Sequence, residues 1–288
     1  MKVFAVIGYL LCFGISDCLW VYPNRKNPVI VSMGVRSIIT CLLFVILFWA
    51  TNNSPVIQAN SSNDIITAIL ISCVSYGGLY FYVKSLKYEQ ASVIAPVTTI
   101  LTSLLGLVFS IIFYHEVLTL RIACCLTAAF AGIALSFSKQ FKGSSKLKIN
   151  KGTLLSIAAA MLWAISYTFF KTPVDNLGVI KFSLILELTI LAINLIILLT
   201  GKHRKALLLL KWGRSTVCLF VIGILIFCGT LLNSYSYKLF PLLYLNVLGK
   251  MGVIIPITYC AIFLKEKLSL LQIGGICILV ASAILIAL

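Results

Sequence analysis

The sequence predicts an all-α integral membrane protein in which ten transmembrane helices form two inverted five-helix repeats. Three observations lead to this fold class. Hydrophobic residues make up 61% of the 288 residues against 10% charged, apolar runs of helical length recur along the chain, and the two halves share one spacing of rare residues. Such a composition leaves too little polar surface for a soluble globule of this size.

Five apolar runs, each of about the 20 residues that a helix needs to cross the hydrocarbon, precede a polar linker. They cover residues 3–21, 29–50, 65–86, 91–113 and 120–137. The first follows Lys2 as the core of a signal peptide would, but no small-x-small cleavage site precedes Trp20 and Pro23, so we expect a retained helix. A polar stretch from Thr51 to Asp64 separates the second run from the third.

Five more apolar runs follow the linker. They cover residues 152–171, 179–200, 216–237, 242–264 and 269–288. The linker reads SKQFKGSSKLKINK and carries five lysines. We therefore divide the chain into a first repeat at residues 1–137, a basic linker at 138–151 and a second repeat at 152–288.

The two halves align when one is shifted by 150 residues, which lays Pro23 on Pro173 and Glu116 on Glu266. Chance similarity in a biased composition is the alternative, but the chain has only seven prolines, so these matches outweigh matches of leucine. Because five spans are an odd number, the second copy enters the membrane from the opposite side. Inverted repeats of this kind underlie alternating access in secondary transporters.

Charge and cysteine content argue against several other classes. The net charge is +16, yet the basic residues lie at the ends of apolar runs and form no continuous basic face, so we expect no nucleic-acid partner. All ten cysteines lie inside apolar runs without a CxxC pair, so we expect no metal site and no cofactor. The lipid bilayer is the expected surrounding, and the chain is predicted to be a multi-pass membrane protein.

The basic residues are distributed unevenly between the two sides of the predicted membrane. Of the 23 lysines and arginines, sixteen fall on the side of the linker and five on the side of the termini, while Arg36 and Lys250 lie within spans. By the positive-inside rule the linker is cytoplasmic and both termini are outside.

Short motifs recur at the ends of spans in both halves. In the first half they read Ser85-Leu86-Lys87-Tyr88, Ala91-Ser92-Val93-Ile94-Ala95-Pro96, Tyr114-His115-Glu116 and Leu118-Thr119, and in the second half Ser236-Tyr237-Lys238, Phe263-Leu264-Lys265-Glu266 and Leu268-Ser269. These motifs resemble the pattern of the EamA family in the drug/metabolite transporter superfamily. Trp163 stands where that family has a tryptophan, whereas Phe13 replaces its counterpart and no glycine precedes Glu116 or Glu266.

The resemblance covers almost the whole chain. It implies an inner-membrane exporter or exchanger of metabolites whose cavity lies between the two halves. It also implies cytoplasmic termini, which conflicts with the distribution of lysine and arginine. The sequence therefore leaves the orientation open.

Charged residues deep within spans are candidates for function, since each costs at least about 2.5 to 3.5 kcal/mol to insert. Lys250 lies near the middle of the ninth span between Gly249 and Gly252, with Asn246 one turn earlier. Its amine is suited to a substrate carboxylate or phosphate, and the alternative is a structural lysine neutralised by an internal acid. Glu187 in the seventh span has four interpretations: the acid that neutralises Lys250, a proton carrier, a contact for a substrate amine, or a residue bonded to a neighbouring helix.

Two further charges lie closer to span ends. Arg36 is about two turns into the second span, and we expect it to snorkel to the interface, with substrate contact as the alternative. Asp17 lies near the end of the first span beside Ser16, where it is either a gate residue or an interfacial cap. Glu116 and Glu266 precede helices, and we expect them to have a structural role at a helix start.

Aromatic residues provide a second indication of a binding site. Tyr76, Tyr80, Trp163 and Tyr167 lie deep enough in their spans to line a cavity for an aromatic or cationic substrate, whereas tyrosines at span ends are typical of the interface. Ser166, beside Tyr167, completes the candidate substrate-binding residues.

The leading functional hypothesis is an exporter or exchanger of small polar metabolites, with amino acids or related zwitterions as substrates and protons as a candidate coupling ion. A nucleotide-sugar or phosphosugar exchanger is the alternative, since Lys250 together with Arg36 suits phosphate. A membrane-embedded lipid-modifying enzyme is a distant third. Such chemistry needs clustered His, Asp or Glu, and the chain has only two histidines, so we do not expect an enzyme.

Overall fold

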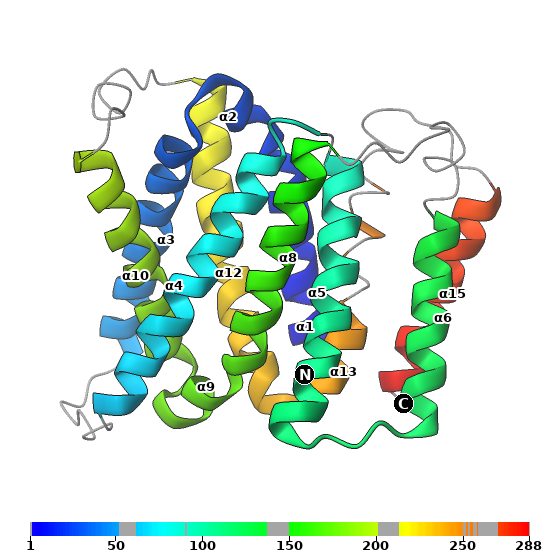
Figure 1. Ribbon diagram of the computed structural model, residues 1–288. Helices are drawn as coiled ribbons and strands as arrows, with labels where there is room; N and C mark the ends of the chain where they lie inside the picture. Colours follow the sequence, from blue (N-terminus) through cyan, green and yellow to red (C-terminus); the bar gives the residue numbers. More distant parts are fainter. Residues whose placement is uncertain are drawn as a thin grey trace.

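The structure is a computed structural model that describes residues 2–51, 62–89, 91–136, 150–200, 213–249, 252, 254–255, 258 and 270–287. Within these residues all regular structure is helical. The long helices stand side by side as a bundle (Figure 1). This agrees with the all-α class that the apolar runs predict.

The first half contains six helices in the described residues. They are α1 (Lys2–Leu19), α2 (Val21–Lys26), α3 (Val29–Thr51), α4 (Ser62–Ser85), α5 (Ala91–Tyr114) and α6 (Leu120–Ser136). The second half contains their counterparts. They are α8 (Lys151–Phe169), α9 (Lys171–Leu177), α10 (Val179–Thr200), α12 (Arg214–Leu239), α13 (Leu242–Leu248) and α15 (Leu270–Ala287).

The helices lie at the predicted spans within a few residues, with two differences. The first and sixth spans each end in a short additional helix, α2 and α9, which carry Pro23 and Pro173 near their starts. Proline is tolerated in the first turn of a helix, where its missing N–H needs no partner. The matched prolines therefore allow a new short helix to begin after α1 and after α8, at the same place in both halves. The ninth span is described continuously only as far as Gly249. The start of the predicted linker falls outside the described residues, and its last residue, Lys151, is the first residue of α8.

The two halves run in opposite directions. In Figure 1, α1 rises from the end of the bundle where both termini lie, whereas its counterpart α8 descends from the other end. The halves also interlock, because α4 packs along α8 and α1 packs along α12, while α3 meets α10 and α6 meets α15. Since α1 and α4 are the counterparts of α8 and α12, the first two contacts are equivalent in the two halves, and the last two join counterparts directly. The inverted-repeat fold class is therefore confirmed.

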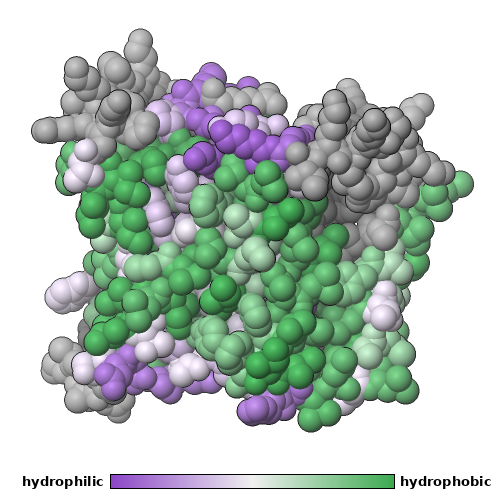
Figure 2. Space-filling view, viewed as in Figure 1, coloured by the Kyte–Doolittle hydropathy of each residue, from purple (hydrophilic) through white to green (hydrophobic). Residues whose placement is uncertain are grey.

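The outer surface is that of a membrane protein. Seven helices in the described residues are long and apolar enough to cross a bilayer, and α6 and α15 contain shorter apolar segments. Figure 2 shows a broad apolar belt between polar bands at the two ends of the bundle. Large apolar side chains such as Trp49 and Leu120 are 76% and 82% exposed on this surface, as expected of residues that face lipid.

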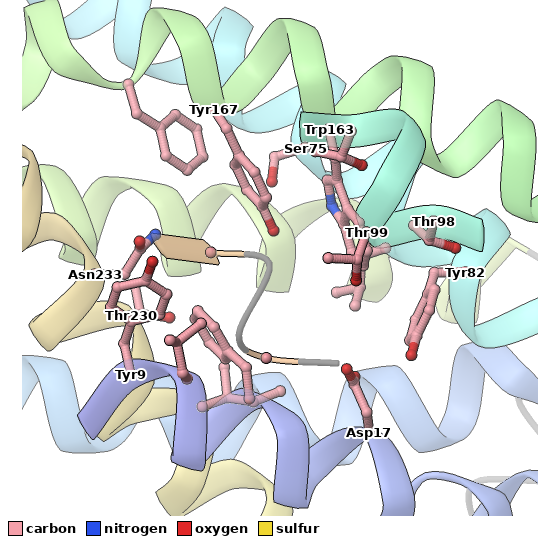
Figure 3. A pocket seen from close by; sticks show the side chains of 18 of the residues that line it. Tyr9, Asp17, Ser75, Tyr82, Thr98, Thr99, Trp163, Tyr167, Thr230 and Asn233 are labelled. Atoms are coloured by element: carbon pink, nitrogen blue, oxygen red, sulfur yellow. The ribbon is translucent and has the colours of Figure 1, made fainter. Parts of the chain in front are cut away.

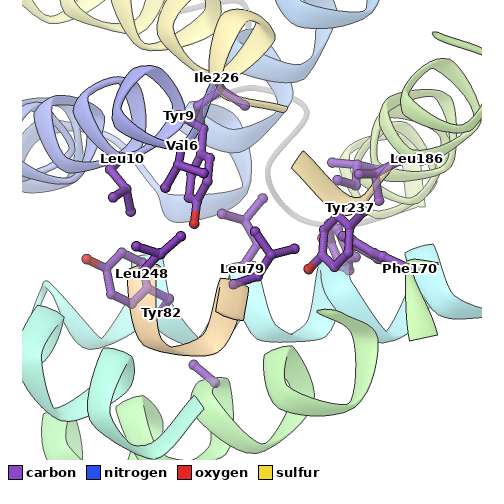
Figure 4. Close-up of a cluster of buried hydrophobic side chains, with 14 of the residues drawn as sticks. Val6, Tyr9, Leu10, Leu79, Tyr82, Phe170, Leu186, Ile226, Tyr237 and Leu248 are labelled. Carbon is purple, nitrogen blue, oxygen red and sulfur yellow. The ribbon is translucent and has the colours of Figure 1, made fainter. Parts of the chain in front are cut away.

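The interior of the bundle is a continuous apolar core to which both halves contribute. Leu10 and Leu79 from the first half meet Leu186, Tyr237 and Leu248 from the second (Figure 4). Because the core belongs to neither half alone, each repeat depends on the other to bury its apolar face.

Glu116 has the structural role expected of it, but on a different helix. Its carboxylate accepts hydrogen bonds from the backbone N–H groups of Leu242 and Leu243, at 2.9 and 2.7 Å, and therefore caps α13 of the second half instead of α6. Lys171 lies 3.7 Å from the same carboxylate. The cap satisfies N–H groups that a helix start leaves without partners, and it ties the end of α5 to the other repeat.

Replacing Gly78 by alanine should destabilise the protein by about 1 to 3 kcal/mol, the usual cost of overpacking. A Cβ atom at Gly78 would lie 2.5 Å from Cδ1 of Trp163, where α4 and α8 approach closely. At Gly274 on α15 no atom lies within 4 Å of such a Cβ, so Gly274→Ala is the matched control and should be neutral or stabilising, since alanine favours helix. Thermal unfolding in detergent measures both, and equal unfolding temperatures for the two variants would contradict the close contact.

Candidate functional site

A cavity of about 240 Å³ lies inside the bundle and is lined by side chains of both repeats. In Figure 3, Asp17, Tyr82 and Thr98 gather at one end of the cavity, and Tyr9, Thr230 and Asn233 at the other. Both groups combine residues from distant parts of the sequence. In transporters built from inverted repeats, the place where the repeats meet is where substrates bind.

Asp17 projects from α1 into this cavity (Figure 3). Its side chain is partly exposed and lines the cavity, a position that favours the interpretation of Asp17 as a gate residue over that as an interfacial cap. Among the described side chains, no basic group forms an ion pair with Asp17. The carboxylate is therefore available to a ligand.

Tyr82 on α4 faces Asp17 and was not among the residues singled out from the sequence. Tyr82 is 2% exposed, and its hydroxyl points toward the Asp17 carboxylate (Figure 3). The ring packs against Trp163 with 5.0 Å between the centroids. The Tyr82 hydroxyl and the Asp17 carboxylate therefore make this end of the cavity polar.

Two of the four predicted aromatic residues line the cavity and two do not. Trp163 and Tyr167 on α8 are stacked in the cavity wall, 5.8 Å apart with an interplanar angle of 12°. Tyr76 instead donates a hydrogen bond to Asn194 Oδ1 at 3.2 Å, and the Tyr80 hydroxyl accepts one from Lys84. The cavity lies on a different side of α4 from Tyr76 and Tyr80.

The stripe of α4 that borders the cavity consists of Ser75, Leu79 and Tyr82. These residues are spaced four and three apart, which places them on one face of a helix, whereas Tyr76 and Tyr80 lie one position further round. The depth of a tyrosine within its span, on which the prediction relied, does not distinguish these faces. The signal that would have identified Tyr82 is its helical spacing from Ser75, which places both residues on the same face of α4.

Arg36 does not snorkel to the interface. Its side chain is 3% exposed, and Nη1 donates a hydrogen bond of 2.6 Å to Oε2 of Glu187, itself 1% exposed. The prediction is wrong because α3 packs along α10, so that an opposite charge is nearer to the guanidinium than the membrane surface is. Both residues border the cavity, and the partner seen for Glu187 is thus Arg36.

Hydrogen bonds extend the contact between α3 and α10 toward α4. Asn194 donates to the Ser37 hydroxyl at 3.1 Å and accepts from Tyr76, so that three helices are joined within the apolar interior. Tyr76 therefore fixes a helix interface beside the cavity.

The remaining predicted residues fall into three groups. Asn246 on α13 borders the cavity, as do Gly249 and Gly252, the glycines on either side of Lys250. Lys250 itself lies outside the described residues, so its role stays a prediction. Ser166 is not among the residues that line the cavity, and its hydroxyl donates to the backbone oxygen of Trp163 at 3.3 Å.

Sequence reasoning also missed the small hydroxyl groups of the cavity. Thr98 and Thr102 on α5 and Thr230 on α12 border it and provide polar groups without charge. Serine and threonine are frequent where membrane helices pack, so their presence in a span is by itself a weak signal.

Two inverted helical repeats that enclose one cavity are the architecture of a class of membrane transporters. The chain belongs to the EamA-like transporter family, whose model matches it twice, at residues 1–138 and 150–288. It is a multi-pass protein of the cell (inner) membrane.

Individual relatives agree with this assignment. The chain is 24% identical over 271 residues to the uncharacterized transporter YvbV of Bacillus subtilis (strain 168), covering 90% of this chain and 83% of that protein. A solved crystal structure of another protein superposes with a TM-score of 0.72 at 14% identity, covering 97% of this chain and 96% of the other. At that identity the structural likeness shows the fold alone.

Proposed function

We propose that the protein exports or exchanges small zwitterionic metabolites, amino acids first among them, by alternating access between its inverted repeats. One observation carries the proposal: an acid without an ion-pair partner among the described residues, Asp17, and a basic group, Arg36, border the same cavity. A zwitterion presents a cation and an anion to such a cavity at once. The aromatic rings of Tyr82, Trp163 and Tyr167 add favourable contacts for a cation.

The size of the cavity supports a small ligand. Its volume of about 240 Å³ is below the range of about 300 to 1,000 Å³ that is typical of sites for drug-sized ligands. A phosphorylated sugar or a nucleotide sugar also needs several basic groups around its phosphates. In the cavity, Arg36 is already neutralised by Glu187, so the described residues favour a ligand with one carboxylate over one with phosphates.

Asp17 suits the ammonium group of the substrate, and protons are a candidate coupling ion. The anionic end of the substrate requires a basic group, for which Lys250 is the candidate from the sequence and Arg36 the one seen to border the cavity.

A ligand screen on the purified protein tests the proposal. Each of the twenty common amino acids, and as alternatives glucose 6-phosphate and UDP-glucose, is added at increasing concentration while thermal unfolding is followed. A ligand present at 100 times its Kd stabilises the folded state by about 2.7 kcal/mol, which is a shift of several degrees. We expect at least one amino acid to give this shift and to be exchanged across vesicles that contain the protein.

The control is the same screen on protein with Asp175→Asn, an exposed acid on α9 that lies away from the cavity and should respond as the wild type does. Stabilisation by the phosphorylated compounds alone would replace the proposal with the exchanger of phosphorylated sugars.

A further inference from the structure

We infer that Arg36 binds the substrate carboxylate through the edge of its guanidinium that carries Nε, and that Glu187 is a positioning residue that holds Arg36 in place for this purpose. The inference rests on the proposed function and goes beyond it, since it assigns the anionic end of the ligand to one side chain.

The first observation is an unsatisfied donor. Glu187 accepts from Nη1 of Arg36, whereas Nε of Arg36 is buried and has no hydrogen-bond partner among the described residues. A guanidinium that served only as the counter-ion of Glu187 would be expected to have its buried N–H groups satisfied, because a buried charged donor without a partner is costly. The orphaned N–H belongs to a side chain that borders the cavity.

The second observation is the geometry of the arginine itself. The guanidinium presents its N–H groups in a rigid planar fork, and the edge formed by Nε and Nη2 matches the two oxygens of a carboxylate. Because Glu187 accepts from Nη1, this other edge keeps a buried N–H, that of Nε, without a partner among the described residues. Lysine offers no such fork, so the arrangement favours a planar anion with two oxygens.

The third observation is that the ion pair is anchored from both sides. Thr40, one turn after Arg36, bonds to the backbone oxygen of Gly223 on α12 at 3.1 Å, and Asn194, two turns after Glu187, bonds to Ser37 at 3.1 Å. The backbones that carry the two charges are therefore fixed relative to each other. Glu187 neutralises Arg36 while the cavity is empty and keeps its orientation, and a substrate carboxylate then shares the guanidinium with Glu187.

The experiment compares an amino acid with its own carboxamide, which has the same shape and ammonium group but no carboxylate. The probe is the amino acid that gives the largest thermal shift in the screen of twenty. Its Kd and that of its carboxamide are measured by titration of the purified full-length protein. In the wild type we expect the amino acid to bind about 10 to 100 times more tightly, the range expected for hydrogen bonds to a charged group.

Removal of Arg36 alone leaves Glu187 buried without its partner and endangers folding, so the principal variant replaces the pair by apolar residues of similar size, Arg36→Met with Glu187→Leu. We expect this double variant to fold, to retain the carboxamide affinity and to lose the preference for the amino acid. Lys84→Met is the matched control for a basic residue of a span, because Lys84 lies outside the cavity lining, and we expect it to keep the preference. Lys250→Met removes the other candidate for the carboxylate and is compared with the double variant.

Glu187→Gln tests the positioning role. Glutamine still accepts a hydrogen bond from Nη1 but no longer neutralises Arg36, so the preference for the amino acid over its carboxamide should increase. A role confined to stability would lower the unfolding temperature and leave this ratio unchanged, which would overturn the assignment of Glu187.

Two outcomes would overturn the assignment of Arg36. If the double variant keeps the preference, or if Lys250→Met loses it, the carboxylate is bound elsewhere, and the proposed function stands without Arg36. If no amino acid shifts the unfolding of the wild type, the proposed function and the inference fail together.

Discussion

Replacing Asp17 by asparagine should weaken amino acid binding about 10- to 100-fold and remove detectable exchange, while the protein stays folded. Asparagine has nearly the same shape but no charge, so it loses the charge-assisted hydrogen bond to the substrate ammonium. Folding should survive because no described basic side chain depends on Asp17 as an ion-pair partner. Counterflow of a labelled amino acid in reconstituted vesicles and thermal shifts in detergent measure the two effects.

Asp175→Asn is again the matched control, because it removes an acid of the same type from an exposed position. Tyr82→Phe separates the hydroxyl that faces Asp17 from the ring, and a smaller loss is expected because Asp17 keeps its charge. If Asp17→Asn transports amino acids at the wild-type rate, the ammonium of the substrate is bound elsewhere in the cavity, or the substrate has none.

The fold could be predicted from the sequence because its main determinant is local. The length of each apolar run sets the length of a helix that crosses the hydrocarbon, and this is why the predicted runs and the described helices agree within a few residues. The opposite orientation of the two repeats in the membrane followed from the number of spans, since an odd number of spans in the first repeat makes the second start on the other side. The matched prolines Pro23 and Pro173 marked the position of α2 and α9, although the break itself was not foreseen.

The site was harder to predict because it depends on which face of each helix meets which neighbour. In a soluble protein, polar and apolar faces alternate with a helical period and identify the buried side. In this chain the lipid-facing and the core-facing sides are both apolar, so that signal is weak. Tyr76 and Tyr82 are therefore alike in sequence, yet Tyr76 contacts Asn194 and Tyr82 borders the cavity.

Long-range pairing was the second obstacle. Arg36 and Glu187 are 151 residues apart, and nothing in their local sequence connects them. The pairing follows only when the packing of α3 along α10 is known. The cost of inserting a charge in hydrocarbon did identify both residues as candidates, but it could not select their partners.

This pairing leads to the largest expected effect on stability. Arg36→Met and Glu187→Leu should each destabilise the folded protein by about 3 to 5 kcal/mol, whereas the two together should be nearly neutral or stabilising. Each single variant leaves one charge buried without its partner, while the double variant replaces both charges by apolar side chains in an apolar interior. Equilibrium unfolding from mild detergent into a denaturing detergent measures the four proteins of this double-mutant cycle.

The control for the cycle is a polar contact beside it that carries no charge, between Asn194 and Ser37 at 3.1 Å. Asn194→Leu should cost less, about 1 to 3 kcal/mol, since it leaves a neutral hydroxyl and not a charge without its partner. Additive losses for Arg36→Met and Glu187→Leu would mean that the two charges do not depend on each other, in contradiction to the 2.6 Å contact. A strong coupling would instead show that each of the two charges is kept in the membrane interior by its partner in the other repeat.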